Sequence, residues 1–317
     1  MNPGPFILKR LVGMVLTLLI ASFVIFGSLY LAPGSPLAFL TRGRATAPGE
    51  MAALRRQYHL NESFPLQYWH WLTGVLHGNL GTSILYRESV WSLIEPRAVN
   101  TAFLVLFAGL MIVVIGLGVG TLAGLRPGWI DTSVMMTATA AMSVPAFVAA
   151  IVLVTIFAVN LNLLPVFGAG SGFVDRIYHL LLPAAALALA NVAYVARLSR
   201  TSVRDARASE HTQTAISRGL PYRLIVRRHI LRNAAIPMTT IIGLTVGGLI
   251  AGAVVIEEAF SLNGMGSYLV DSVGHKDFPV VQAISLIFVV AFIVINSLVD
   301  VLYTMLDPRV RARAAGE

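Results

Sequence analysis

Six long apolar stretches, separated by shorter polar segments, dominate the pattern of this 317-residue chain. A helix needs roughly 20 predominantly apolar residues to cross the hydrocarbon core of a bilayer. Stretches of about that length or more, without Asp, Glu, Lys or Arg, cover residues 11–32, 98–125, 132–165, 177–196, 233–256 and 278–299. The third has room for one helix over 132–159 and a turn over 160–165. The pattern predicts an all-α, polytopic membrane protein with six transmembrane helices.

The first apolar stretch follows Lys9 and Arg10, as the apolar region of a secretory signal peptide would. Such a region usually has roughly 7–15 residues and precedes a cleavage site made of small residues. This stretch is longer and no clean cleavage site follows it, so we expect a retained helix. The chain then divides into the N-terminus with the first helix (1–32), an extracytoplasmic segment (33–97) and a five-helix core (98–317) with a cytoplasmic loop (197–232).

The distribution of basic residues predicts the orientation, because short cytoplasmic loops carry an excess of Lys and Arg. With six spans both termini lie on one side, together with the loops 126–131 and 197–232. That side carries 15 basic residues, and nine of them are arginines between Arg197 and Arg232. The other side carries eight, six of which lie in the long segment 33–97, where the rule has little force. We therefore expect both termini in the cytoplasm.

The segment 33–97 is the one sizeable region expected outside the membrane. It opens with Pro33-Gly34-Ser35-Pro36, which does not continue a helix. A charged stretch with helical spacing follows over 50–58, and then an aromatic stretch through Tyr68, Trp69 and Trp71. Tryptophans near the ends of membrane spans usually mark the interface. Two interpretations stay open: a cap packed on the helices, or a docking surface for an external partner.

Composition agrees with a membrane location and excludes several other classes. Hydrophobic residues make up 56% of the chain and charged residues only 12%, whereas soluble domains have about 25% charged residues. The net charge of +8 comes from 21 Arg and 2 Lys, and their clustering on one side makes it a topology signal, so we expect no nucleic-acid partner. Cysteine is absent and the seven histidines are scattered, so we expect no metal site on this chain.

The chain lacks the motifs of energy-coupling chemistry. There is no phosphate-binding loop of the G-x-x-x-x-G-K-[ST] form and no Rossmann glycine pattern after a strand. We expect no catalytic residue and no cofactor on this chain. If the protein pumps a solute, the energy comes from another chain or from an ion gradient.

Glycines and polar side chains within the spans indicate either close packing between helices or the lining of a translocation path. The glycines over 116–124 and 243–252 favour close helix packing, with a flexible gate as the alternative. Asp, Glu and His do not lie near the middle of a span, as a proton-coupled carrier would require. Candidates for lining a translocation path, each of which could equally form an interhelical hydrogen bond, are Thr137, Ser143, Asn191, Tyr194, Thr245 and Asn296.

The cytoplasmic loop between the fourth and fifth spans contains a further predicted helix. Residues 206–218 lack Gly and Pro, and Gly219-Leu220-Pro221 supplies a stop. One weakly apolar face would be shared by Ala208, Thr212, Ala215 and Ile216. Such a helix either lies on the surface in solvent or fits into a groove of a soluble partner.

At this loop the sequence resembles the inner-membrane permease subunits of bacterial dipeptide, oligopeptide and nickel ABC importers. Permeases of this kind share an E-A-A-x3-G loop, and the peptide subgroup favours T-A-x3-G, which Thr214-Ala215 and Gly219 match. The following Arg228-His229, Leu231-Arg232-Asn233-Ala234 and Ile236-Pro237 resemble the subgroup's R-H-x-L-R-N-A-x-x-P. Further motifs in family order, with Asn79 in place of the usual Asp, are 33–36, 65–68, 78–83, 143–145, 163–165, 182–184, 252–257, 263–266, 277–282 and 307–309.

The resemblance implies a type I ABC importer permease and its partners. These are a second, homologous permease, two cytoplasmic ATPase subunits that hold ATP and Mg, an external solute-binding protein or lipoprotein, and the membrane lipid. The long external segment implies the first permease of the pair, and the cargo would be dipeptides or other short peptides. The helix around 206–219 would be the coupling helix, with its ATPase contacts at Arg207, Glu210, Thr214, Ala215, Arg218 and Gly219.

Alternatives remain in substrate and in class. Within the importer class the cargo could be nickel, glutathione or haem. An ion-coupled secondary carrier is the alternative from another class; such folds usually show an internal repeat and charged residues at the membrane midplane, and neither is evident here. A structural membrane scaffold would not associate with an ATPase.

Overall fold

The computed structural model describes residues 4–31, 48–57 and 60–306, and these are almost entirely helical. Five of its helices are long and apolar enough to cross a membrane, and a bent helix pair brings the number to six if it counts as one span. The all-α, polytopic prediction is confirmed. The turn at 33–36 and the motif at 307–309 lie outside the described residues.

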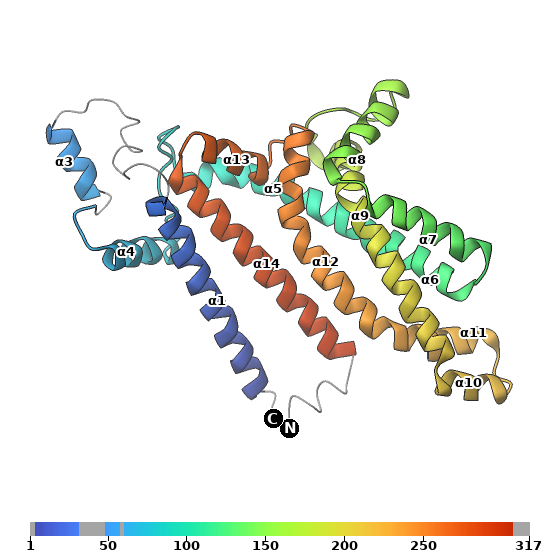
Figure 1. Ribbon diagram of the computed structural model, residues 1–317. Coiled ribbons are helices and arrows are strands. Elements are labelled where there is room, and N and C mark those ends of the chain that lie inside the picture. Colours follow the sequence, from blue (N-terminus) through green and yellow to red (C-terminus); the bar gives the residue numbers. More distant parts are fainter. Residues whose placement is uncertain (1–3, 32–47, 58–59, 307–317) are drawn as a thin grey trace. The chain divides into compact units, whose positions relative to one another are not determined.

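Figure 1 shows the helices in their order along the chain. Their bounds are α1 (Gly4–Leu31), α3 (Pro48–Gln57), α4 (Phe64–Leu76), α5 (Val90–Met111), η1 (Ile112–Gly116), α6 (Leu117–Leu125), α7 (Trp129–Met142), α8 (Ala146–Leu153), η2 (Val154–Asn160), α9 (Gly172–Ala208), α10 (Glu210–Ser217), α11 (Tyr222–Leu224), η3 (Ile225–Leu231), α12 (Arg232–Ala259), α13 (Met265–Gly274) and α14 (Phe278–Leu306). The η segments are π-helical turns, and η1 continues α5 directly into α6.

The third span differs from the prediction of a single helix over 132–159. It ends at Met142, restarts at Ala146 and bends by 104° between the two halves. Pro145 precedes the second half in an extended conformation, with φ −59° and ψ 145°. Proline has no amide hydrogen and disfavours helical geometry in the residue before it, so the helix breaks here. Pro183, by contrast, lies inside α9, which continues through it to Ala208.

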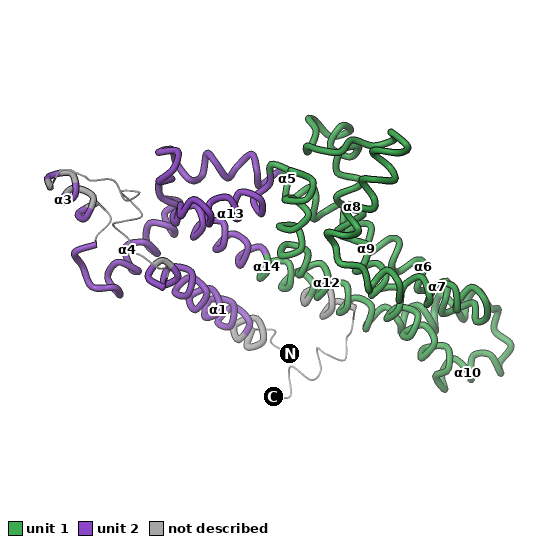
Figure 2. The backbone as a smooth tube through the Cα atoms, turned by 45° about the horizontal axis from the view of Figure 1, so that its top comes forward, with its two compact units in different colours: residues 1–2, 100–263, 292–317 green, residues 3–99, 264–291 purple. Residues whose placement is uncertain are grey.

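Contacts divide the chain into two compact units (Figure 2). Among the described residues, unit 1 contains 100–263 and 292–306, and unit 2 contains the residues up to Val99 together with 264–291. The helices α5 and α14 each contribute residues to both units. The units therefore do not follow the linear division of the sequence at 97, because the segment 264–291 belongs with the N-terminal part.

In unit 1 the long helix α9 lies beside α6, α7, α8 and α12 (Figure 1). The glycines of η1 and α6 carry no side chain, and this allows the backbone of α9 to come very close to these two segments. A Cβ on Gly124 would lie 2.7 Å from the Val203 Cβ, and one on Gly120 would overlap the Ala196 carbonyl oxygen. Gly118 faces open space. The predicted close packing of helices is confirmed for one face of α6.

In unit 2 the first helix packs against α4 through aromatic rings. Phe26 is buried and lies within 6 Å of the rings of Phe64, Tyr68 and Trp71. Offset and edge-to-face ring pairs at this separation stabilise packing beyond the area that they bury. The aromatic stretch within 33–97 therefore packs on the first helix, as the cap interpretation predicts, while Trp69 is exposed.

A buried carboxylate fixes the loop before α5 in unit 2. Asp277 is 1% exposed and accepts hydrogen bonds from the Ser83 hydroxyl and the amides of Ile84 and Leu85. Carboxylates that accept several backbone N–H groups form strong, charge-assisted bonds. Nearby, burial raises the pKa of Tyr268 to about 12; the Asp277 charge adds to the rise, and the guanidinium of Arg97 opposes it.

Candidate translocation cavities and coupling helix

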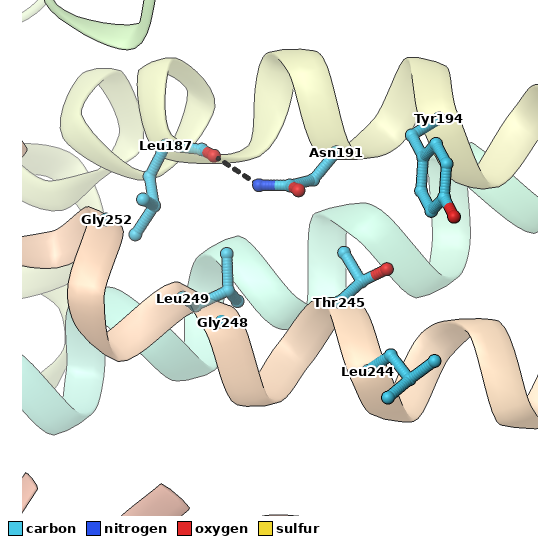
Figure 3. A pocket seen from close by; sticks show the side chains of 8 residues that line it. All are labelled: Leu187, Asn191, Tyr194, Leu244, Thr245, Gly248, Leu249 and Gly252. Atoms are coloured by element: carbon cyan, nitrogen blue, oxygen red, sulfur yellow. Dashed lines mark hydrogen bonds between the residues drawn. The ribbon is translucent and has the colours of Figure 1, made fainter.

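A cavity of about 260 Å³ lies between α9 and α12 in unit 1 (Figure 3). Three of the six predicted path residues line it: Asn191 and Tyr194 from α9 and Thr245 from α12. Leucine side chains and the backbone at Gly248 and Gly252 complete the lining. The cavity thus combines an apolar wall with a few polar groups, which is the usual make-up of a site for small organic molecules.

The polar groups of this cavity are mostly satisfied by their own helices. The Asn191 amide donates to the Leu187 carbonyl at 3.1 Å (Figure 3). The Thr245 hydroxyl donates to the Ile241 carbonyl at 2.8 Å. The Tyr194 hydroxyl forms no hydrogen bond within the described part of the chain, and the residue is 42% exposed. Tyr194 is therefore the lining residue best able to bond a solute.

The other three predicted path residues lie elsewhere. Thr137 is exposed on α7, and its hydroxyl donates to carbonyls of its own helix. It lines neither this cavity nor the second one described below. Asn296 on α14 packs against Gly247, where an added Cβ would lie 2.9 Å from its side-chain nitrogen. Its amide donates to the Phe292 carbonyl at 2.8 Å. Asn296 thus lies at a close helix contact, whereas Ser143 lines a second cavity.

The second cavity is a groove of about 600 Å³ along α7, closed on one side by α9. Besides Ser143 and Thr139 it is lined by Asp131 and Arg200. Arg200 holds the Asp131 carboxylate by two parallel bonds, one of them 2.8 Å long, and Arg204 donates to the same carboxylate at 2.5 Å. Asp131, Arg200 and Arg204 each stand near a span end, where charged residues are common, so they were not predicted as a site; the i,i+4 spacing of the two arginines was the available signal.

The predicted coupling helix is shorter than expected. A helix over 206–218 was predicted, but α9 continues to Ala208, and α10 begins only at Glu210. Ser209 between them has extended geometry, with φ −63° and ψ 148°. The Ser209 hydroxyl donates to the Ala206 carbonyl at 2.6 Å, a local bond to the last turn of α9 of the kind by which serine favours helix ends, so α9 stops and a new helix starts here.

Hydrogen bonds tie α10 to the end of α9. The Thr212 hydroxyl, fully buried, donates to the Ala206 carbonyl at 2.8 Å, and the Gln213 amide donates to the Arg207 carbonyl at 3.1 Å. These carbonyls belong to the last turn of α9, whose acceptors have no partners within the helix. The side chains of α10 therefore complete the end of α9 and hold the two helices at a defined angle.

Four of the six predicted coupling residues are on the surface. Glu210, Thr214, Arg218 and Gly219 are exposed. Gly219 has φ +71°, in the left-handed region, and its amide bonds the Ile216 carbonyl at 2.9 Å, so it ends α10 as predicted.

The other two coupling residues contact their own chain. Ala215 is 3% exposed and packs with Val203 and Ile230, and the Arg207 side chain donates to the Leu125 carbonyl at 3.2 Å. The predicted apolar face is correct for Thr212 and Ala215 and wrong for Ala208 and Ile216, which are exposed. The buried face of α10 is therefore narrower than the predicted apolar face, and tertiary packing decided which of its residues are buried.

The described residues contain no group of three or more His, Asp or Glu side chains placed to hold a metal ion. His211 of α10 and His229 of η3 lie near each other, with ring centroids 6.4 Å apart, and His211 also contacts the Asn233 amide at 2.9 Å. These contacts connect α10 with η3 and the start of α12. The helix α10 is thus attached to both α9 and α12.

Two family models match the chain. Residues 116–312 match the binding-protein-dependent transport system inner membrane component, and residues 5–104 match the N-terminal membrane component of such systems. Between them they cover almost the whole sequence.

Curated relatives and solved structures agree with these matches. The chain is 38% identical to a glutathione transport system permease protein GsiC from Pectobacterium atrosepticum and 35% identical to one from Escherichia coli K12, over 96% of this chain and 98% of each relative.

Two solved structures share the fold, each at 16% identity over 68% of this chain: an inward-facing MetNI methionine ABC transporter (TM-score 0.57, 96% of that chain) and an amino acid ABC transporter with histidines (TM-score 0.51, 94% of that chain). Together with its apolar helices, these findings establish that the chain belongs to the binding-protein-dependent transport system inner membrane components, as a multi-pass ABC importer permease of the peptide, oligopeptide and nickel type.

Proposed function

We propose that this permease carries short peptides inward, with glutathione as the leading cargo. The observation that supports glutathione is the name shared by relatives that match nearly the whole chain at 35–38% identity. Glutathione is itself a short peptide, so this proposal keeps the peptide class and places dipeptides second. Nickel and haem are the competing cargoes.

The working complex in this proposal has several partners. A second, homologous permease completes the transport unit, and two cytoplasmic ATPase subunits bind ATP and Mg and supply the energy. An external solute-binding protein or lipoprotein delivers the cargo to the outer face, where the segment 33–97 lies. Both termini and the loop 197–232 face the cytoplasm, in agreement with the excess of arginine there.

In this proposal α10 is the coupling helix. Its exposed residues Glu210, Thr214 and Arg218 meet a groove of the ATPase, while Thr212 and Ala215 hold it to its own chain. Because α10 is bonded to the last turn of α9, a push on α10 moves α9 with it. The helix α9 is continuous over 37 residues and lines both cavities, so it transmits this movement to the solute path.

Uptake by cells that lack this gene, with and without the restored gene, tests the proposal. Labelled glutathione, a dipeptide, a pentapeptide and nickel are compared at equal expression of the complex. Uptake of glutathione that depends on the gene and on the ATPase genes supports the proposal. Uptake of nickel alone would show that the cargo is nickel and not a peptide. Gradient-driven uptake that survives loss of the ATPases would show that the protein works as a secondary carrier.

A further inference from the structure

The ion-pair cluster at the groove between α7 and α9 holds more positive than negative charge, because Arg204, beside the lining residues, pairs with the same carboxylate as Arg200. The side chain of Asp131 is 9% exposed and is shared by the guanidinium groups of Arg200 and Arg204. Arginine stays protonated in proteins, so the cluster carries a net charge of one positive unit when the aspartate is ionised. Excess charge next to apolar surface is costly unless an opposite charge completes it. The cluster is therefore suited to an anionic ligand.

Arg200 has hydrogen-bond donors available for such a ligand. Its Nε and Nη2 both bond to Asp131, whereas its Nη1 forms no hydrogen bond among the described residues. Two parallel bonds to one carboxylate fix the plane of a guanidinium. Asp131 thus orients Arg200, which itself lines the groove.

The remaining lining fits a small polar solute better than a lipid chain. The α7 side of the groove presents the hydroxyls of Thr132, Thr139 and Ser143 beside Met135 and Met136. The whole of α7 contains no Leu or Phe, whereas most exposed residues of α1 are Leu, Val, Ile and Phe, as is usual for a surface in hydrocarbon. Methionine side chains adapt to ligands of varied shape, as the side chains of different peptides require.

We propose that the α7–α9 groove is a subsite for a carboxylate of the transported solute. Arg200 binds the carboxylate, and Asp131 is the positioning residue that holds Arg200. The inference rests on the proposed function, because glutathione and dipeptides carry an ionised C-terminal carboxylate at neutral pH. Asp131 is the third residue of α7 and follows the loop 126–128, so the subsite lies toward the cytoplasmic end of the path.

The test uses the full complex of both permeases, ATPases and binding protein in proteoliposomes. Uptake of labelled glutathione and of glycyl-leucine is measured together with ATP hydrolysis stimulated by the loaded binding protein. In an Arg200→Met complex we expect ATP hydrolysis within about twofold of wild type and solute imported per ATP reduced about tenfold, the size of a lost charged hydrogen bond. Arg200→Lys should keep most of the uptake, and Arg197→Met, one turn away and exposed, is the matched control.

A double variant separates binding from structure. Asp131→Asn with Arg200→Met removes both charges of the two-bond pair and leaves Arg204 beside a neutral amide, so a purely structural role of that pair predicts that uptake returns. Our proposal predicts that uptake per ATP stays low although the complex assembles. Restored uptake in the double variant, or unchanged uptake per ATP in Arg200→Met, would overturn the subsite.

Lipid composition distinguishes a solute site from a headgroup site. If wild type loses its advantage over Arg200→Met when phosphatidylglycerol is omitted from the phosphatidylcholine vesicles, the groove holds a lipid phosphate and the subsite is wrong. Failure of the wild-type complex to import either solute would instead overturn the proposed function, and this inference with it.

Discussion

The hydroxyl of Thr212 in α10 donates a 2.8 Å hydrogen bond to the carbonyl of Ala206 in the last turn of α9. Both residues are buried, so the bond lies inside the corner between the two helices. The proposed coupling role of α10 needs such a fixed joint, because a helix hinged only by Ser209 would swing without moving α9.

Replacing Thr212 with Val should uncouple ATP hydrolysis from uptake. Valine has nearly the same shape as threonine but cannot donate, so the Ala206 carbonyl keeps only its bond from the Ser209 hydroxyl and loses the one that ties α10 to it, at a cost of about 0.5–1.5 kcal/mol. We expect less uptake per ATP hydrolysed, measured in proteoliposomes. Thr214→Val is the control, because Thr214 is exposed and its hydroxyl only bonds the Glu210 carbonyl of its own helix. Equal effects of the two changes would contradict a joint at Thr212.

Replacing Gly219 with Val should reduce transport while the protein still inserts into the membrane. Gly219 has φ +71°, and no neighbouring atom lies within 4 Å of a Cβ added there. The penalty therefore comes from the backbone alone, about 1–2 kcal/mol for an L-residue in this region. Uptake and membrane content are both measured, and normal uptake would show that the chain tolerates another ending of α10.

Gly120→Ala should destabilise the helix pair α6–α9, whereas Gly118→Ala should not. A Cβ on Gly120 would overlap the Ala196 carbonyl and lie 2.7 Å from the Ser199 Cβ, while Gly118 faces open space two residues away. Overpacking of this kind costs about 1–3 kcal/mol. The thermal unfolding midpoint of the purified complex should fall for Gly120→Ala only; a fall of equal size in both variants would point to a general effect of helix glycines.

Asp277→Ala should loosen the loop around Ser83 in unit 2. The change leaves the Ser83 hydroxyl and two backbone amides without their acceptor, which costs about 1–3 kcal/mol for each buried group. We expect faster proteolysis of this loop in purified protein. Asp271→Ala is the matched control, because its carboxylate is half exposed and pairs with His275 on the surface of α13. Unchanged proteolysis in Asp277→Ala would mean that the loop is held by other contacts.

The sequence alone determined the membrane class and the apolar segments that form its helices, five of them single long helices and one a bent pair. Transfer of a helix into hydrocarbon depends on its summed composition, which needs no knowledge of neighbours, so the apolar stretches sufficed. Gly219 could also be identified, since a stop after a short helix is a local backbone property. The motif order added the family, which the comparisons confirmed.

Only the tertiary structure decided which faces and partners these elements use. In a membrane helix most positions are apolar, so periodicity says little about which side meets a neighbour; Ala215 is buried although it was predicted to face the ATPase. Asn191 and Thr245 meet in one cavity, and Asp131 meets Arg200 across 69 positions of sequence, because α9 passes between α7 and α12. Such long-range pairs arise from helix packing, which no local pattern encodes.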